Sequence, residues 1–362
     1  MAEQLKLVAV GGLGLMLSPA ATHLMGDDSP AKFVRVHDRG TRDERRERAR
    51  EAWRQHGAEL VSTFDDLVGD GRIDGAVICA GKNGDDLAIL RELVPLMRRR
   101  GVESGFILHL STVSTNFAEA AEAFCRDHGL DYGNYPLTGG PAGAKAATML
   151  ILASGNRALY NRLEPVLQKL GKPRYFGERV TAGAEVKLIG HFMVFNGLMG
   201  IASGAALHAA CFGYELGDPA QVDFFEFLNA GAGGTRQWEV AISKGIRDHV
   251  WDQGFMLQHA VVDAIYAAKL GMDRGLAGYA LTSMLMTALG FAFLLQTYPG
   301  QPLATHAIVR EMIGANRQAL DDFVHSRLNP ADVAGTLRQC VEALPEAIRQ
   351  TVLLDIQRSD FG

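Results

Sequence analysis

A glycine-rich loop near the start of the chain has the residue types and the position of a nucleotide-binding turn. Gly12-Leu13-Gly14 directly follows the apolar segment Leu5–Val10, which we expect to be a buried parallel strand, and precedes an expected helical segment. The first glycine permits a tight turn, and the second lets the backbone approach a pyrophosphate at the helix N-terminus. Leu17 stands at the position of the usual third glycine. The loop alone therefore also fits a plain tight turn.

An acidic residue at the end of the next expected strand strengthens the nucleotide-binding interpretation. Asp38 follows the strand 33–36, at about the distance from the loop that a ribose-binding carboxylate has. Its carboxylate would accept hydrogen bonds from the adenosine ribose and would repel a 2′-phosphate, which favours NAD. Arg39 and Arg42 point to NADP, since guanidinium groups suit a phosphate, but both also fit solvated residues at a helix start. The sequence predicts NAD or NADP as the cofactor, with NAD favoured.

The elements that would position these residues alternate between strands and helices in the first half of the chain. Such alternation of short apolar runs with helical runs is typical of a doubly wound parallel sheet. From Ala184 onward the pattern is almost entirely helical. We therefore expect an α/β Rossmann domain over residues 1–181 and an all-helical domain for substrate binding and dimerisation over residues 182–362. The expected strands are 5–10, 33–36, 73–79, 106–110 and 148–153, and the expected helices are 41–55, 87–100 and 117–128.

Composition and charge exclude several classes of function. The 362 residues carry a formal net charge of −5, which gives no reason to expect nucleic acid or an anionic membrane as a partner. The four cysteines are widely scattered, which argues against a disulfide framework or a zinc cluster and indicates a reducing compartment. We expect no bound metal.

Two uncharged stretches raise the question of membrane insertion. Residues 188–214 and 275–309 contain no Asp, Glu, Lys or Arg, and each exceeds the ~20 residues that cross a bilayer. Neither has a Lys/Arg cluster on one flank, so we favour helices buried in a large or intertwined core. The N-terminal apolar run contains Gly11, Gly12 and Gly14, which suits a strand and its turn better than a signal peptide. We expect a cytoplasmic protein.

Six short motifs follow one another along the chain. They are Gly12-Leu13-Gly14-Leu15-Met16 with Pro19, His109 to Ser114, Thr138 to Ala144, Gly183 to Lys187, Gly233 to Trp238, and Phe255 with Asp263. In order and spacing they are similar to the GLGxMGxP, DxSTxS, SGGxxGA and GxGxxxK motifs, and to two weaker downstream patterns, of one family. The chain resembles the β-hydroxyacid dehydrogenases, the relatives of 3-hydroxyisobutyrate and 6-phosphogluconate dehydrogenases, from Leu5 to about Ala268.

The resemblance implies a catalytic lysine at Lys187 and an NAD(P)-dependent interconversion of a 3-hydroxy-acid-like alcohol and its carbonyl. A base must take the hydroxyl proton while the cofactor accepts the hydride. Lys187 suits this role if apolar surroundings lower its pKa, and the uncharged helix that follows would supply them. In the reverse direction its ammonium would protonate or polarise the carbonyl oxygen.

The resemblance assigns the other contacts by position. The family has a substrate-binding Asn at the position of His191, one helical turn from Lys187, although a satisfied core histidine is an equally good interpretation. The expected substrate contacts are Ser111, Thr138, Gly139, Gly140, His191 and Trp238. The expected cofactor contacts are Gly12, Leu13, Gly14, Leu15, Met16, Asp38, Arg39 and Asp263. Plain structural roles also fit: glycine turns often only reverse a chain, Trp238 suits a helical core, and Asp263 can merely orient a helix or Lys187.

Four residues depart from the family pattern: Leu17 replaces Gly, His109 replaces Asp, His191 replaces Asn and Val262 replaces Lys. Leu17 should change the helix-to-sheet packing near the pyrophosphate, and the other three alter the polar shell of the expected site. An imine reductase on the same scaffold is a second interpretation, but members of that branch usually lack the lysine, so Lys187 argues against it. The four departures also keep open a non-catalytic dinucleotide-binding sensor.

The family pairs its subunits through the helical domain, so the resemblance implies a homodimer or a larger assembly that hides the uncharged helices. The active site would lie in the cleft between the domains. The amphipathic tail from His325 to Gly362 is longer than in typical members. We expect that it helps to build a partner subunit's site.

Overall fold

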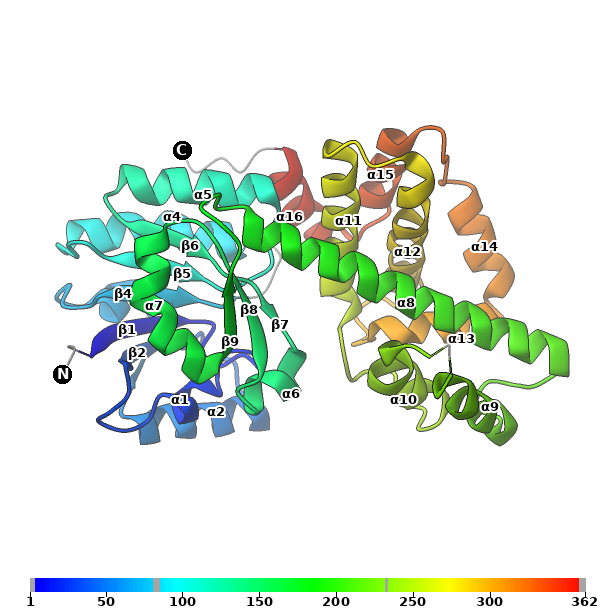
Figure 1. Ribbon diagram of the computed structural model, residues 1–362, viewed down its shortest axis with the longest axis horizontal. Coiled ribbons are helices and arrows are strands. Elements are labelled where there is room, and N and C mark those ends of the chain that lie inside the picture. Colours follow the sequence, from blue (N-terminus) through cyan, green and yellow to red (C-terminus); the bar gives the residue numbers. More distant parts are fainter. Residues whose placement is uncertain (1–3, 81–84, 232–233, 358–362) are drawn as a thin grey trace. The chain divides into compact units, whose positions relative to one another are not determined.

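The computed structural model describes residues 4–80, 85–231 and 234–357 of the chain (Figure 1). It divides into two compact units, of which the first comprises residues up to Lys187 together with the chain from Leu354, and the second comprises Leu188–Leu353. The predicted boundary lies before residue 182, whereas the two units divide after Lys187, inside the helix that carries this residue. Gly233 and the last five residues of the predicted tail lie outside the described residues.

A six-stranded parallel sheet forms the centre of the first unit, which confirms the predicted doubly wound fold. The strand order is β3-β2-β1-β4-β5-β6, and all neighbours are parallel. The order reverses between β1 and β4, and ligands bind at the carboxyl ends of the strands beside such a reversal. The strands are β1 Leu5–Val10, β2 Ala31–His37, β3 Glu59–Val61, β4 Gly75–Ile78, β5 Phe106–His109 and β6 Asp131–Asn134.

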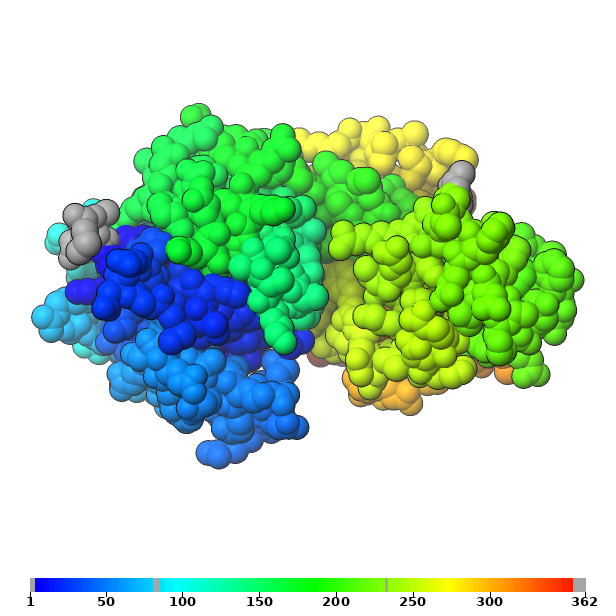
Figure 2. Space-filling view, turned by 60° about the horizontal axis from the view of Figure 1, so that its bottom comes forward, coloured from blue at the N-terminus to red at the C-terminus, as the bar shows by residue number. Residues whose placement is uncertain are grey.

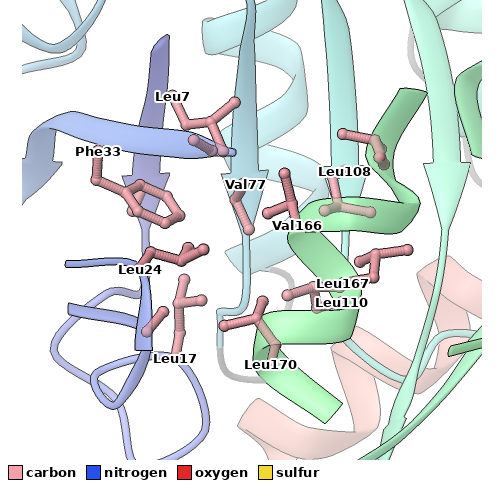
Figure 3. Packing of buried hydrophobic residues seen from close by; sticks show 14 of the residues in the cluster. Leu7, Leu17, Leu24, Phe33, Val77, Leu108, Leu110, Val166, Leu167 and Leu170 are labelled. Atoms are coloured by element: carbon pink, nitrogen blue, oxygen red, sulfur yellow. The ribbon is translucent and has the colours of Figure 1, made fainter. Parts of the chain in front are cut away.

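Helices cover both faces of this sheet because its strands are apolar on both sides. In β1, Leu7 and Ala9 belong to one hydrophobic cluster, and Val8 and Val10 belong to the other, as the two-residue period of a strand requires. Figure 3 shows Val77 and Leu108 of the sheet beside Val166 of α7, and Phe33 beside Leu24. The helices of this unit are α1 Ala20–His23, α2 Glu44–His56, α3 Phe64–Val68, α4 Asp85–Arg99, α5 Thr115–Asp127, α6 Gly140–Lys145 and α7 Arg157–Leu170.

A second, three-stranded sheet follows in the chain. Its strands are β7 Leu137–Thr138, β8 Met149–Ala153 and β9 Gly171–Tyr175, with β7 antiparallel and β9 parallel to β8. Figure 2 shows the segments of about 140–180, in green, beside the blue N-terminal segments. A hydrogen bond from the His23 ring to the Ala144 carbonyl, 2.9 Å long, joins the two.

The second unit is helical, as predicted. The hairpin of α11 and α12 forms its core, and α15 packs against both helices. Its helices are α8 Ala182–Phe212, which begins in the first unit, α9 Pro219–Asn229, a π-helical turn Trp238–Ile242, α10 Ser243–Ile246, α11 Leu257–Asp273, α12 Gly278–Thr297, a short 3-10 turn Thr305–Ala307, α13 Ile308–Ile313, α14 Arg317–His325, α15 Val333–Glu342 and α16 Glu346–Gln357.

The two uncharged helices, α8 and α12, differ in how much of their surface is buried within this chain. Both α8 and α12 are long and apolar enough to cross a membrane by length and composition, which is weak evidence because core helices pass the same test. In α12, 61% of the most apolar window is buried, which agrees with a core helix. In α8 the share is only 39%. The expected burial of α8 is therefore incomplete within this chain.

The extra C-terminal helices pack on their own chain. The Gln296 side chain of α12 donates a 2.6 Å hydrogen bond to the Ala343 carbonyl, and the Cys340 thiol of α15 lies 3.7 Å from the Leu285 carbonyl oxygen. This part of the tail completes the core of the second unit. Its expected contribution to a partner's site stays a prediction.

One glycine at the start of α8 allows the helix to approach the small sheet. A Cβ on Gly183 would lie 2.2 Å from the Leu152 carbonyl oxygen, and the Gly183 amide donates a 2.9 Å hydrogen bond to Ser154 Oγ. We predict that Gly183→Ala lowers the free energy of unfolding by about 1–3 kcal/mol, because β8 or α8 must shift. Urea unfolding followed by circular dichroism measures this loss.

Gly190 on the same helix is the matched control. A Cβ there meets no atom within 4 Å outside the local helix backbone, so Gly190→Ala should be neutral or stabilising by up to about 1 kcal/mol. Equal destabilisation by both substitutions would contradict the close approach of α8 to β8.

Candidate functional site

The loop after β1 makes its tight turn at Gly11, one residue before the glycine that the motif indicates. Gly11 has φ +80°, and a Cβ there would lie 2.1 Å from the Cys79 carbonyl oxygen after β4. Gly12 makes room for a different neighbour, because its Cβ would lie 2.6 Å from Val36 Cγ1 of β2. Both positions therefore require glycine, for contacts with the two strands that flank β1.

Helix α2 holds the carbonyl groups of this loop. Trp53 Nε1 donates a 2.8 Å hydrogen bond to the Gly12 carbonyl, and Arg45 donates a 3.1 Å bond to that of Leu13. Because C=O and N–H of a trans peptide point in opposite directions, the Leu13 amide points away from Trp53. The Gly12 and Leu13 amides donate no hydrogen bond within the described part of the chain. Such amides fit the pyrophosphate of a dinucleotide.

The helix expected directly after the loop begins later than predicted. The chain runs through turns, with Gly14 N bonded to the Gly11 carbonyl and Ser18 N to the Gly14 carbonyl, and helix α1 begins only at Ala20. Leu17, 1% exposed, fills the space where a third glycine would bring a helix close to the sheet, and it lies between Leu24 and Leu170 (Figure 3). The loop amides, and not a long helix, thus provide the anion-binding groups. Of the other two predicted contacts in this segment, Leu15 is half exposed and Met16 is partly buried.

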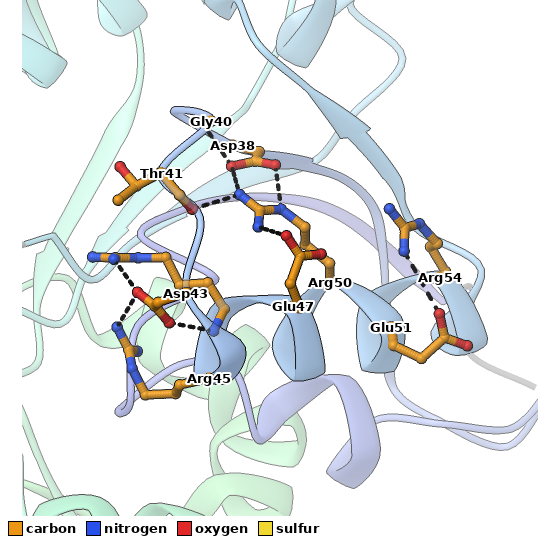
Figure 4. Close-up of polar contacts among 10 residues, drawn as sticks. Asp38, Gly40, Thr41, Asp43, Arg45, Glu47, Arg50, Glu51 and Arg54 are labelled. Carbon is orange, nitrogen blue, oxygen red and sulfur yellow. Dashed lines mark hydrogen bonds and ion pairs between the residues drawn. The ribbon is translucent and has the colours of Figure 1, made fainter.

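The carboxylate of Asp38 is neutralised by an arginine. Arg50 Nε and Nη2 donate bonds of 2.7 and 2.8 Å to the two oxygens of Asp38, and Gly40 N donates a third bond (Figure 4). These contacts, with Arg50 first, hold the pKa of the Asp38 carboxyl below its usual value. Lone pairs on both oxygens still permit bonds from ribose hydroxyls. The repulsion expected toward a 2′-phosphate is reduced, because Arg50 balances the charge.

The two arginines that follow Asp38 are on the surface. Arg39 is 66% exposed and forms a 3.2 Å ion pair with Asp85 of α4, and Arg42 is exposed. Exposed guanidinium groups can reorient toward a phosphate at small cost. The geometry therefore favours NAD less strongly than the sequence pattern does.

We predict that Arg50→Met lowers the affinity for NADP⁺ about tenfold more than that for NAD⁺, because Asp38 then carries an uncompensated charge. Isothermal titration with each cofactor measures both dissociation constants. Arg54→Met is the control, since Arg54 lies one turn further on α2 and pairs only at the surface, with Glu51 at 3.6 Å. An unchanged NADP⁺/NAD⁺ ratio in Arg50→Met would contradict the neutralising role.

Lys187 is a buried amine held against the small sheet. It is 8% exposed, and Nζ donates bonds of 2.7 Å to the Leu137 carbonyl and 3.0 Å to Thr138 Oγ1. Burial lowers its pKa to about 8. Thr181 stands where the family motif has its first glycine. Its Oγ1 donates a hydrogen bond to the Glu185 carboxylate, which closes the first turn of α8. The predicted catalytic lysine and the predicted Thr138 are therefore neighbours.

The glycine turn after Thr138 has the backbone shape that its sequence indicates. Gly139 has φ +133° and Gly140 φ +64°, both in the region that favours glycine. Gly140 begins α6, and a Cβ on it would meet no atom within 4 Å. The turn is thus open at Gly140, directly after the residue that holds Lys187.

Ser111 lies at the carboxyl edge of the large sheet, just after β5. Its hydroxyl is 3.3 Å from the Ala80 carbonyl oxygen and 3.2 Å from Asp86 Oδ1. Asn134, fully buried at the end of β6, donates to the carbonyls of His109 and Ser111, both at 3.1 Å. The loop that carries Ser111 is therefore fixed by side chains from β6 and α4.

The predicted residues of the helical unit form two separate groups. On α8, His191 Nδ1 lies 3.0 Å from Asp263 Oδ2 of α11, and the ring contacts those of Phe195 and Phe255, which stack on each other. Asp263 thus orients His191, and its expected cofactor contact stays a prediction. Trp238 is 3% exposed and stacks on Phe225 at 5.4 Å, as a core residue does. Val262, at the position of the family's lysine, is fully buried.

Sequence reasoning missed the side chains that support the loops: Trp53, Arg50, Asp86 and Asn134. The arginine-rich run 41–55 predicts a solvated helix, yet Ala49, Arg50, Trp53 and His56 are buried at helical spacing. A tryptophan in an arginine-rich helix was the available signal. For Asp86 and Asn134 the sequence offers none, because their partners are distant in the chain. Groups of three or more side chains suited to a metal ion do not occur in the described ranges.

Comparison with known proteins agrees with this geometry. Residues 7–186 match the family model for the NAD binding domain of 6-phosphogluconate dehydrogenase. This part of the chain belongs to that family. The match includes the glycine loop, Ser111 and the start of α8, and it confirms the resemblance that the motifs indicate.

Among curated relatives, the chain is 28% identical over 105 residues to 2-(hydroxymethyl)glutarate dehydrogenase of Eubacterium barkeri, covering 29% of this chain and 35% of the relative. It is 30% identical over 183 residues to L-threonate dehydrogenase of Pectobacterium atrosepticum, covering 50% and 57%. The chain thus spans about a third and somewhat over half of these two proteins' lengths.

Solved structures share the fold over most of the chain. The 3-hydroxyisobutyrate dehydrogenase of Salmonella typhimurium has a TM-score of 0.67 at 20% identity, covering 85% of this chain and 99% of that one. An imine reductase variant of Myxococcus stipitatus in complex with NAD⁺ has a TM-score of 0.52 at 18% identity, covering 86% and 100%. At such identities the similarity shows the fold alone.

Proposed function

We propose that this protein is an NAD(P)-dependent oxidoreductase that interconverts a 3-hydroxy-acid-like alcohol and its carbonyl, with Lys187 as the general acid and base. The observation that carries the proposal is a buried lysine, one turn into α8, within hydrogen-bond distance of Thr138 beside an open glycine turn. The family of residues 7–186 and the named dehydrogenases among the relatives support it. The cofactor, when bound, accepts or returns the hydride.

Lys187 is suited to move a proton near neutral pH. Because burial lowers its pKa to about 8, both the amine and the ammonium are well populated between pH 7 and 9. The neutral amine takes the proton of the substrate hydroxyl during oxidation, and the ammonium returns it to the carbonyl oxygen during reduction. The Leu137 carbonyl and Thr138 Oγ1 hold the ammonium in place.

The residues around Lys187 suit a small acid. We propose that the open turn at Gly139 and Gly140 holds the substrate carboxylate through backbone N–H groups and that Ser111 contacts a polar substituent. His191, oriented by Asp263, lies at i+4 from Lys187 on α8 and would contact the substrate oxygen. NAD or NADP is bound by the loop after β1. NAD stays favoured over NADP, because the carboxylate of Asp38 would still repel a 2′-phosphate on the ribose to the extent that Arg50 does not offset its charge.

We predict that Lys187→Ala lowers turnover by about 10²–10⁴-fold while the dissociation constant for NAD⁺ is unchanged. In the wild type, the oxidation rate rises with pH up to about 8 and then levels, and the reduction rate falls above about 8, because these directions need the neutral and the charged amine of Lys187. Steady-state rates with 3-hydroxyisobutyrate, L-threonate and 2-(hydroxymethyl)glutarate between pH 6 and 10 measure both effects.

Lys169→Ala is the control, since this lysine is exposed on α7. Retention of more than half of the turnover in Lys187→Ala would overturn the assignment. Turnover only with ketone-plus-amine mixtures would instead identify an imine reductase. Tight cofactor binding with no turnover on any of these compounds would identify a sensor.

We further propose that two or more copies assemble through the helical unit. The exposed residues of α8 include Ile189, Met193, Gly200, Ser203 and Leu207. Their spacings of three, four and seven place them along one side of the helix, with two small residues that permit close packing. A second copy of α8 and its neighbours would cover this apolar stripe. With its free cysteines and net charge of −5, we propose a cytoplasmic protein whose partner is neither nucleic acid nor a membrane.

We predict that Met193→Asp, at a residue 71% exposed, shifts the protein toward a monomer, because a carboxylate would be desolvated in the interface. Light scattering after size-exclusion chromatography in detergent-free buffer measures the mass. Met25→Asp is the control, since Met25 is an equally apolar residue, 51% exposed, in the first unit. A wild type that is monomeric at all concentrations would contradict the assembly, and a need for detergent would favour membrane insertion.

A further inference from the structure

A histidine and a carboxylate are buried together behind Ser111. His109 is the last residue of β5 and is fully buried, and Asp86 lies in the first turn of α4 and is 6% exposed. His109 Nε2 lies 3.1 Å from Asp86 Oδ1. The same carboxylate oxygen lies 3.2 Å from Ser111 Oγ. One oxygen of Asp86 thus joins the histidine to the serine.

The other nitrogen of His109 is also occupied. Nδ1 lies 2.9 Å from the hydroxyl of Tyr132, a residue of β6 that is 3% exposed. The contact of Nε2 with Asp86 is electrostatic, since Nε2 makes no aligned hydrogen bond. The nearby carboxylate, which can only accept, favours a ring that carries a hydrogen on Nε2. In the neutral ring, Nδ1 then accepts from the Tyr132 hydroxyl. Contacts on both nitrogens fix the orientation of the imidazole.

The neighbouring carboxylate of Asp86 explains why a histidine, and not an acid, suits this position. A buried carboxylate is costly unless it is paired and hydrogen-bonded. Within the described ranges no lysine or arginine pairs with Asp86, and His109 is its basic partner. An aspartate at position 109, as in the family motif, would face Asp86 with like charge. His109 and Asp86 therefore depend on each other.

We propose that the His109–Asp86 pair is a positioning element of the substrate site that commits the Ser111 hydrogen to the protein and turns the Ser111 oxygen into an acceptor. Ser111 has one hydroxyl hydrogen, and its two acceptors are Asp86 Oδ1 and the Ala80 carbonyl. A ligand then meets only lone pairs on Oγ. The substrate group at Ser111 is accordingly a donor, a hydroxyl or an ammonium, and the carboxylate lies elsewhere. This inference rests on the proposed function for the identity of the bound ligand.

Two substitutions of His109 separate its two contacts. The amide of Gln reaches about as far as Nε2 and can still donate to Asp86, whereas the amide of Asn reaches only as far as Nδ1. We expect His109→Asn to raise KM for L-threonate at least about fivefold with kcat within about twofold, and His109→Gln to restore KM. Tyr132→Phe, which removes the Nδ1 partner but keeps the Asp86 contact, should raise KM less than His109→Asn does. Equal KM values in all variants would overturn the proposal.

Asp86→Asn is the second variant, and it should raise KM as His109→Asn does. Unfolding midpoints and NAD⁺ dissociation constants are measured in parallel. A KM change that Gln does not rescue, or that follows loss of stability, would show a merely structural role and overturn the proposal.

A readout without turnover separates this proposal from the proposed function. In protein labelled with ¹⁵N-imidazole histidine, we expect the His109 Nε2 resonance, identified by its loss in His109→Gln, to shift in Asp86→Asn and to keep its position in Lys187→Ala. If the wild type turns over none of the compounds but this shift is present, the proposed function fails and the His109–Asp86 pairing stands. If turnover is present but the resonance does not respond to Asp86→Asn, the pairing is overturned.

Discussion

A buried ammonium group must be hydrogen-bonded, and the start of the long helix α8 is arranged around this constraint at Lys187. The Leu137 carbonyl and Thr138 Oγ1, both of β7, receive its hydrogens. That contact requires α8 to lie close to the small sheet, which Gly183 permits by presenting no side chain to Leu152. The low pKa of Lys187 and the close packing of α8 are thus two results of one arrangement.

Three buried or partly buried acids in the described part of the chain each lie beside a base, and each contact holds a different feature. Asp38 and Arg50 shape the end of β2, Asp86 and His109 hold the loop after β5, and Asp263 orients His191 in the helical unit. A pair of this kind contributes little net stability but enforces one geometry, because a broken pair leaves a charge without a partner. These contacts therefore hold the polar groups in defined positions.

The sequence was informative where a local pattern determines local structure. Apolar runs predicted β1, β2, β4, β5 and β8, and glycines at set spacings predicted the turns. Strands β3, β6, β7 and β9 are not predicted, because they are short or include polar residues. The helical segment expected directly after the glycine loop begins only at Ala20, because Leu17 packs in a cluster with residues distant in the chain, such as Leu170. Likewise, nothing local to Asp38 shows that Arg50, twelve residues later, holds both of its oxygens.

The bond from Trp53 to the Gly12 carbonyl has a consequence for observing this protein. The indole is fully buried, stands edge-on to Phe33 at 5.0 Å, and is bonded to the backbone of the loop that fits a pyrophosphate. Its emission depends on that hydrogen bond and on the polarity around the ring. The other two tryptophans, Trp238 and Trp251, belong to the helical unit. Replacing Trp238 and Trp251 would therefore leave Trp53 as the one tryptophan of the sequence, and its fluorescence would report on the loop after β1.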